Sequence, residues 1–133
     1  MNAVNFERRK VRSVNPNRAI SYLFRSIARD ADVGHMALAD KRGLLLVHAG
    51  EEETCDVLAA YAPLLSQTVD PESRDTLLGT MTSYLSEASP EKISVRRFEY
   101  AGEALFLCAL GKIGAGKDVA VCRAISGARR ILA

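Results

Sequence analysis

The stretch that decides the fold is HMALADKRGLLLVHAG, from His35 to Gly50. Two short apolar runs flank the tetrapeptide DKRG, in which Asp40 and Gly43 occupy the favoured first and last positions of a tight turn. We therefore predict a β-hairpin. The 44–47 run is apolar at successive positions, not alternate ones, which predicts a strand in the middle of a sheet with both faces covered.

Helix signals lie on both sides of this hairpin. Before it, Asn15 is a potential cap and Pro16 suits a first helical position, and apolar residues then repeat at helical spacing up to Val33. After it, three glutamates at 51–53 favour a helix start because their charge complements the helix dipole. That second helix is predicted over 52–69, with a kink at Pro63.

The helix over 52–69 has apolar residues on more than one side. One face of a sheet cannot bury all of them, so we expect a further partner for this helix. The candidate partner-surface residues here are Leu58, Tyr61 and Leu65.

The second half of the chain repeats these elements. Asp70 and Pro71 signal another helix start, and we predict a helix over 71–88, with a strand as the alternative because Gly79 weakens the helix pattern. Residues 92–100 and 104–111 predict a second hairpin, whose later strand belongs in the middle of the sheet. Its aromatic residues Phe98 and Tyr100 complete the candidate partner surface. A closing helix is predicted from residue 117, with a strand over VAVC, residues 119–122, as the alternative.

The stretch GKIGAGKD, residues 111–118, nearly spells a phosphate-binding loop. Lys117 has the spacing of that motif, but Asp118 stands where Ser or Thr binds magnesium, and a carboxylate there repels phosphates. The residues that follow are too few for the parallel strand and second acidic ligand of such hydrolases. We interpret the loop as a connection with Asp118 as helix cap. A weak hydrolase that uses Lys117 is the rival hypothesis.

Composition and charge limit the function further. The chain has 133 residues, of which 48% are apolar and 26% charged, as expected of one compact domain. Residues 1–30 hold seven Lys or Arg against two acids, although the net charge is only +2. We predict a basic, flexible N-terminal arm over 1–14 and a single domain over 15–133. A solvated arm is favoured over one that tethers the domain to nucleic acid, a membrane surface or an acidic protein.

Reactive side chains are few. Cys55, Cys108 and Cys122 lie in apolar runs, which predicts reduced, buried thiols. His35 and His48 are potential cross-strand neighbours at the ends of the first hairpin, and no motif places a nucleophile beside them. We expect no metal, no cofactor and no catalysis. Without an apolar run of about 20 residues or a signal core, a cytoplasmic protein is expected.

The order helix, hairpin, helix, hairpin, helix predicts an α/β (α+β) domain with an antiparallel sheet between helices, a profilin-like layer architecture. In this order, AISYLFRSIARDADVGHMALADKRGLLLVHAGEEETCDVLAAYAPLL, residues 19–65, resembles the first half of a bacterial roadblock domain. That family includes roadblock-type dynein light chains, MglB-like regulators and Ragulator subunits. RRFEYAGEALFLCALG, residues 96–111, is similar to its later strands. The helix after Asp70 is long for the family, and a usual third strand is missing or displaced, which affects the sheet edge.

The resemblance, over about residues 18–111, implies a non-enzymatic module that forms homodimers, or heterodimers with a paralogous roadblock protein, and docks a Ras-like small GTPase or motor complex. Neither nucleic-acid binding nor membrane insertion is expected. The alternative is a small-molecule sensing domain of profilin-like or PAS-like shape. Its pocket requires converging polar groups, and the central strands offer only Cys108 and His48.

Overall fold

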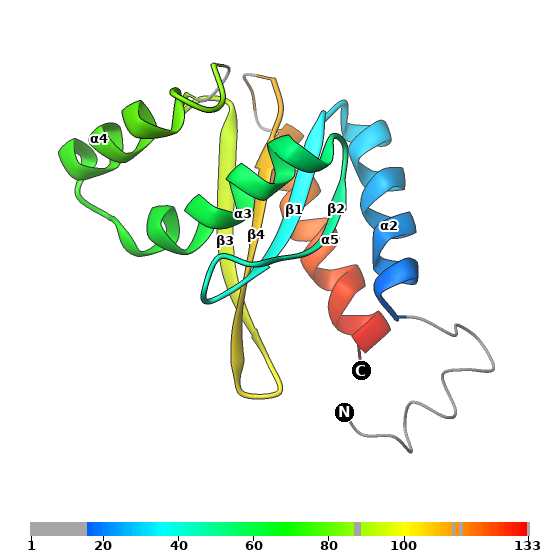
Figure 1. The fold of residues 1–133 in the computed structure, drawn as a ribbon. Coiled ribbons are helices and arrows are strands. Elements are labelled where there is room, and N and C mark those ends of the chain that lie inside the picture. Colours follow the sequence, from blue (N-terminus) through cyan, green and yellow to red (C-terminus); the bar gives the residue numbers. More distant parts are fainter. Residues whose placement is uncertain (1–15, 87–88, 113, 115, 133) are drawn as a thin grey trace.

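A four-stranded antiparallel sheet forms the middle layer of the molecule, and helices cover both of its faces (Figure 1). The computed structural model describes residues 16–86, 89–112, 114 and 116–132. The elements in chain order are α2 (Pro16–Ala31), β1 (His35–Asp40), β2 (Leu45–Ala49), α3 (Glu52–Gln67), α4 (Pro71–Met81), β3 (Ile93–Tyr100), β4 (Glu103–Leu110) and α5 (Gly116–Leu132). This confirms the predicted α+β class.

The predicted N-terminal arm and the Asn15 cap lie outside the described residues. Among the helices that the structure does describe, none is long and apolar enough to cross a membrane.

The strand order is β2-β1-β4-β3, so each hairpin supplies one central and one edge strand. β1 and β4 pair from His35 opposite Leu110 to Asp40 opposite Leu105. The final five residues of β4 are buried on both faces of the sheet, as the sequence predicted for this strand.

The prediction that the 44–47 run lies in the middle of the sheet was wrong. β2 is an edge strand, and Leu44 and Leu46 are 56% and 40% exposed. Pairing with β1 shifts register between Leu38 and Ala39, because Leu46 has no partner and forms a bulge. Since a bulge breaks the alternation of side chains, successive apolar residues here do not mean that both faces are covered.

The turn of the first hairpin forms as predicted. The Gly43 amide donates to the Asp40 carbonyl at 2.9 Å, and the Asp40 carboxylate accepts from the amides of Leu44 and Arg42. These bonds, with that from Leu44 the stronger influence, lower the pKa of Asp40. Gly43 has φ +82°, and a Cβ there would lie 3.1 Å from the Ala60 Cα of α3. Glycine therefore lets the turn both reverse and press against α3.

Helices α2 and α5 lie side by side on one face of the sheet. Their apolar sides, with Phe24 at the centre, form one core against the strands. The helices come so close that a Cβ on Gly127 would lie 2.4 Å from the Leu23 Cδ2 atom. α5 begins at Gly116, so Asp118 lies in its first turn and is not the predicted cap.

Helices α3 and α4 occupy the opposite face. α3 crosses all four strands and continues through Pro63 to Gln67. α4 begins where the sequence predicts, because the Asp70 carboxylate caps it by accepting from the Ser73 amide at 2.9 Å. It ends at Met81, so the segment predicted as one helix over 71–88 is helical only in its first part. Among the described residues between α3 and β3, the segment after Asp70 begins as the predicted helix and not as the alternative strand.

Candidate protein-interaction surface

The inner side of α3 is sealed within the chain. Five residues on this side have no exposed area: Cys55, Leu58, Ala59, Ala62 and Leu65. Leu58 and Leu65 therefore belong to the core and are not available to a partner, which corrects the sequence prediction. The reason is that α4 packs beside α3 and adds Leu78 and Met81 to the same core, so two sides of α3 are covered by its own chain.

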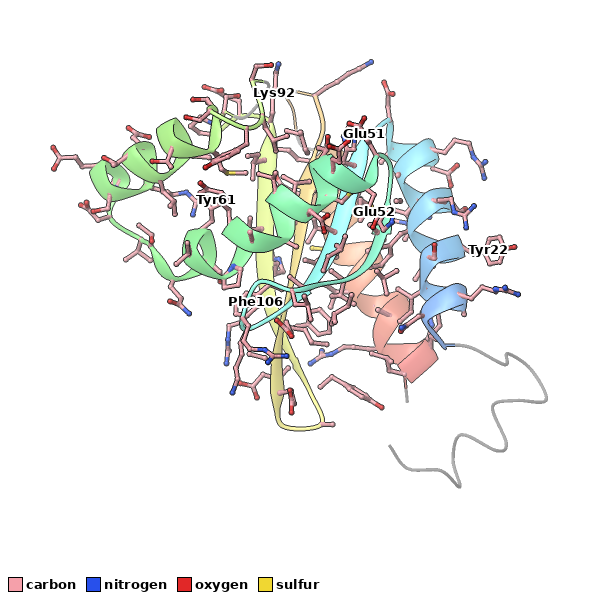
Figure 2. The ribbon with its side chains drawn as sticks, viewed as in Figure 1. Tyr22, Glu51, Glu52, Tyr61, Lys92 and Phe106 are labelled. Atoms are coloured by element: carbon pink, nitrogen blue, oxygen red, sulfur yellow. The ribbon has the colours of Figure 1, made fainter. Side chains whose placement is uncertain are left out.

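The outer side of α3 keeps an apolar stripe. Val57, Ala60, Tyr61 and Leu64 follow one another at spacings of three, one and three residues, which places them on one side of a helix. Tyr61 is half-buried and Leu64 is 49% exposed. Figure 2 shows Tyr61 on the side of α3 nearest α4. Of the five predicted surface residues, Tyr61 alone lies on this stripe.

Leu44 extends the stripe from a different element. The Gly43 backbone lies against α3 at Ala60, which brings the neighbouring Leu44 to the same region with more than half of its surface exposed. We call the set Leu44, Val57, Ala60, Tyr61 and Leu64 the α3 patch. Sequence reasoning missed Leu44 because the strand was expected to be central. The small residues Ala59 and Ala62 were the available signal for the inner side, since they permit close approach to the sheet.

The two ends of α3 differ in charge. Glu52, Glu53 and Asp56 are exposed near its beginning, and Figure 2 shows Glu51 and Glu52 at that end. The last turn contains no basic residue. The Arg74 guanidinium of α4 donates to the Leu65 carbonyl at 2.6 Å, which places a positive charge at the far end of the helix. The α3 patch therefore lies between an acidic and a basic end.

Phe98 and Tyr100 have internal roles, which corrects their assignment to the partner surface. Phe98 is buried in the core under α5, and the Arg129 guanidinium lies 5.7 Å from its ring centroid. The Tyr100 hydroxyl donates to the Leu132 carbonyl. Both residues attach the end of α5 to the sheet because their side chains point to that face of β3.

The glycine-rich loop bonds to itself. The Lys117 ammonium donates to the Gly114 carbonyl at 2.6 Å, and Lys117 is buried. The side chain that a phosphate-binding loop directs at its ligand thus donates to the loop's own backbone, which favours the interpretation as a connection.

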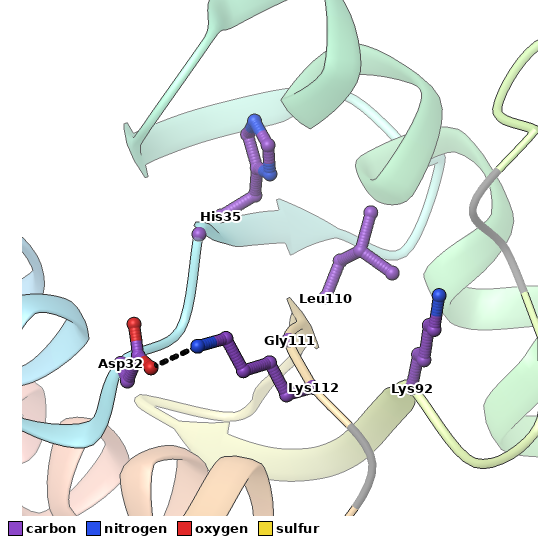
Figure 3. Close-up of a pocket in the computed structure, with 7 residues that line it drawn as sticks. Asp32, His35, Lys92, Leu110, Gly111 and Lys112 are labelled. Atoms are coloured by element: carbon purple, nitrogen blue, oxygen red, sulfur yellow. Dashed lines mark hydrogen bonds and ion pairs between the residues drawn. The ribbon is translucent and has the colours of Figure 1, made fainter.

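A cavity of about 570 Å³ lies at the end of the sheet beside this loop (Figure 3). Its lining is Asp32, Gly34, His35, Lys92, Leu110, Gly111 and Lys112. The Lys112 ammonium pairs with the Asp32 carboxylate at 2.5 Å, and this pair raises the pKa of Lys112. Both side chains of the pair are about three-quarters exposed. The cavity is therefore an open hollow at the surface, unlike the enclosed pocket that the sensing alternative requires.

The cysteines divide into two kinds. Burial raises the pKa of Cys55 and of Cys108 to about 12, so both remain protonated at neutral pH. The Cys55 thiol also donates to the Ala49 carbonyl at 3.3 Å. Cys122 is exposed, which corrects the expectation that all three are buried. Its helical neighbours leave it on the solvent side of α5.

The two histidines do not face each other. His48 pairs with Ala37, and its Nδ1 atom is buried without a hydrogen-bond partner, whereas His35 pairs with Leu110 of β4. In the described part of the chain, no three His, Cys, Asp or Glu side chains gather into a metal-binding group. With neither a metal-binding group nor a paired histidine site found among the described residues, the α3 patch remains the candidate functional site.

Comparison with solved structures places this arrangement among roadblock folds. MglB of Myxococcus xanthus is similar with a TM-score of 0.52 and 15% identity, over 87% of this chain and 89% of that one. An MglB with a tetrameric arrangement is similar with a TM-score of 0.53 and 19% identity, over 87% of this chain and 89% of that one. The gliding protein MglB of Thermus thermophilus is similar with a TM-score of 0.54 and 18% identity, over 87% of this chain and 90% of that one. No protein-family model and no curated protein sequence matches. The fold is that of an MglB-like roadblock domain.

Proposed function

We propose, from the roadblock fold that this chain shares with MglB, that it is a non-enzymatic cytoplasmic scaffold that dimerises and binds a Ras-like small GTPase. The observation that carries the proposal is the α3 patch, an apolar surface that remains after the chain has covered its own sheet. Apolar surface of this kind, rimmed by charge, is typical of protein interfaces. The domain that carries it spans residues 15–133.

A symmetric homodimer can bury the α3 patch of both copies in one interface. In a two-fold interface each patch covers its twin, so a single set of residues provides both halves. Tyr61 is of the residue type that most often dominates interface energies, and Leu64 lies one turn away. The patch is therefore suited to a second copy of this chain, or to a paralogous domain with the same layout.

The charges at the ends of α3 favour an antiparallel arrangement of the two copies. Such an arrangement puts the acidic end near Glu53 against the far end of the partner helix, where that copy's own arginine bound to the Leu65 carbonyl lies. A parallel arrangement places two acidic ends together, and like charges at an interface are unfavourable. We expect the antiparallel dimer.

The GTPase part of the proposal is supported by the resemblance to roadblock domains and by the MglB-like fold. We expect the dimer to bind a Ras-like GTPase whose gene lies beside its own. The affinity should depend on whether the GTPase holds GDP or GTP. Calorimetric titration of the GTPase, loaded with GDP or with a non-hydrolysable GTP analogue, measures this. If neither the GDP-loaded nor the GTP-analogue-loaded GTPase gives a heat of binding, the assignment of the partner is contradicted. The proposal of a dimer is not affected by that result.

Light scattering after size-exclusion chromatography tests the dimer. Wild type should have the mass of two chains, and Leu64→Asp should raise the dissociation constant at least roughly 30-fold because it puts a charge into the apolar interface. Tyr22→Asp is the matched control, since Tyr22 is 61% exposed on the opposite layer, and it should remain dimeric. A monomeric wild type at high concentration, or equal dissociation of both variants, contradicts the proposal.

A further inference from the structure

The two helical layers carry opposite charges. α2 and α5 together contain seven basic and two acidic residues, a net charge of +5. α3 and α4 contain five acidic residues and one basic residue, a net charge of −4. The chain as a whole has a net charge of only +2, so the separation between its faces is much larger than the total suggests.

The basic residues of α2 and α5 form two parallel stripes on the outer side of their layer. In α2 the stripe is Arg18, Tyr22, Arg25 and Arg29, with spacings of four, three and four residues. In α5 it is Val119, Arg123, Ser126 and Arg130, with the same spacings. These spacings keep each set on one side of its helix, and all eight side chains are exposed. We call these two stripes the arginine face.

A groove runs between the two stripes. It has a volume of about 380 Å³ and is lined by Leu23, Ile27, Cys122, Arg123, Ser126 and Arg130. Its walls combine aliphatic side chains from α2 with two guanidinium groups from α5. This combination suits a ligand with a phosphate next to an apolar or glycerol-like portion.

Little negative charge offsets the arginine face. The Asp30 carboxylate lies 3.9 Å from the Arg123 guanidinium. An exposed ion pair at this long distance contributes little to stability. Within the part of the chain that the structure describes, Arg18, Arg29 and Arg130 have no ion pair. The guanidinium groups are therefore available to an external anion.

We propose that the arginine face docks on an anionic phospholipid surface, with lipid phosphates bound by arginines at the groove. Tyr22 is 61% exposed and Val119 is 55% exposed at this face, and Figure 2 shows Tyr22 pointing away from the sheet. Exposed aromatic and apolar side chains among basic ones are typical of surfaces that rest in the lipid headgroup region. The acidic layer on the opposite side orients the molecule, because an anionic surface repels it.

The shape of the face favours a flat surface over nucleic acid. Two helices packed side by side are about 20 Å wide with their side chains, whereas the major groove of DNA is about 12 Å wide and admits one helix. Neither α2 nor α5 projects from the layer (Figure 1). In the sequence, four basic residues, Arg8, Arg9, Lys10 and Arg12, precede α2.

Vesicle sedimentation tests the proposal, which is independent of the dimer and the GTPase. The full chain should bind vesicles of phosphatidylcholine mixed with phosphatidylglycerol, should not bind phosphatidylcholine alone, and should be released by salt. Each basic residue near such a surface contributes about a five-fold gain in partitioning, so Arg123→Ala with Arg130→Ala should reduce binding roughly 30-fold. Both residues are exposed, so circular dichroism and thermal unfolding should remain unchanged.

A matched variant separates the face from net charge. Lys41→Ala with Arg97→Ala removes the same number of charges from outside the arginine face and should bind vesicles like wild type. Arg97 lies opposite Phe106 on the α3 side of β3, and Lys41 is exposed in the turn between β1 and β2. Equal loss in both variants, or no preference for phosphatidylglycerol, overturns the proposal. So does binding that depends only on residues 1–15, or retention of a DNA duplex through Arg123 and Arg130 without vesicle binding.

Discussion

Helices α2 and α5 close one face of the sheet by contacting each other as well as the strands, whereas α3 lies over the other face with only α4 beside it. On the first face Leu23 and Gly127 interlock, and the end of α5 is held by Tyr100 and Arg129. On the second face Leu64 is 49% exposed, and Tyr61 is half-buried against the edge of the core. One layer is therefore closed by contact between its two helices, whereas the other leaves the apolar side chain of Leu64 half exposed.

The largest expected effect contrasts the two faces directly. Phe24 has no exposed area at the centre of the first face, so Phe24→Ala should lower the free energy of unfolding by about 3–5 kcal/mol through lost burial and a cavity. Leu64→Ala should change it by no more than about 0.5 kcal/mol in dilute, monomeric protein. Urea denaturation measures both. A similar cost for the two substitutions would mean that Leu64 is a core residue, and the contrast between the faces would fail.

An intermediate effect is expected where a glycine joins the sheet to α3. Gly43→Ala should cost about 2 kcal/mol, because φ is +82° and the new methyl group meets the α3 backbone at Ala60. Gly127→Ala is the control. There the three atoms nearest the new methyl group all belong to the side chain of Leu23, which can rotate away, and the gain in helix propensity of about 1 kcal/mol offsets the cost. Thermal unfolding distinguishes them, and a larger loss for Gly127→Ala would reverse our ranking of the two close contacts.

The smallest effect is confined to α4. The bond from the Ser73 amide lowers the pKa of Asp70 below its ordinary value of 3.8. Because the folded pKa is the lower one, the cap is fully stabilising above pH 3.8 and is lost as the pH falls through the folded pKa. The protection of the α4 amides against hydrogen exchange, measured relative to the intrinsic rate at each pH, should therefore fall in acid before that of α2. In Asp70→Asn, which caps without a charge, this acid dependence should disappear.

Local rules predicted most elements of this fold. The turn at Asp40 and Gly43, the cap at Asp70 and the helical spacing in α2 each depend on residues close in sequence, and all three appear in the structure. The central position of β4 also followed from its apolar run. Local signals still misplaced two helix boundaries, because Asp118 lies inside the first turn of α5 and α4 ends at Met81.

The candidate surface was harder to predict because it depends on what covers each element. Leu58 and Leu65 differ from Leu64 only in which side of α3 they occupy, and that side is set by the sheet and by α4. Leu44 was expected to be buried in a central strand. An edge strand with a bulge can have the same run of successive apolar residues as a central strand, so the sequence did not distinguish them. Tyr100 was expected outside, and its partner, the Leu132 carbonyl, comes from the far end of the chain.

The pairing of β1 with β4 has a consequence for synthesis on the ribosome. The whole α3–α4–β3 segment lies between these strands in sequence, and α2 meets its helical neighbour only after β4 has also formed. While the chain emerges, the side of α2 around Phe24 remains without its final cover until α5 leaves the exit tunnel. Such late, long-range closure is slow, and it leaves apolar surface of the nascent chain exposed until the last helix is in place.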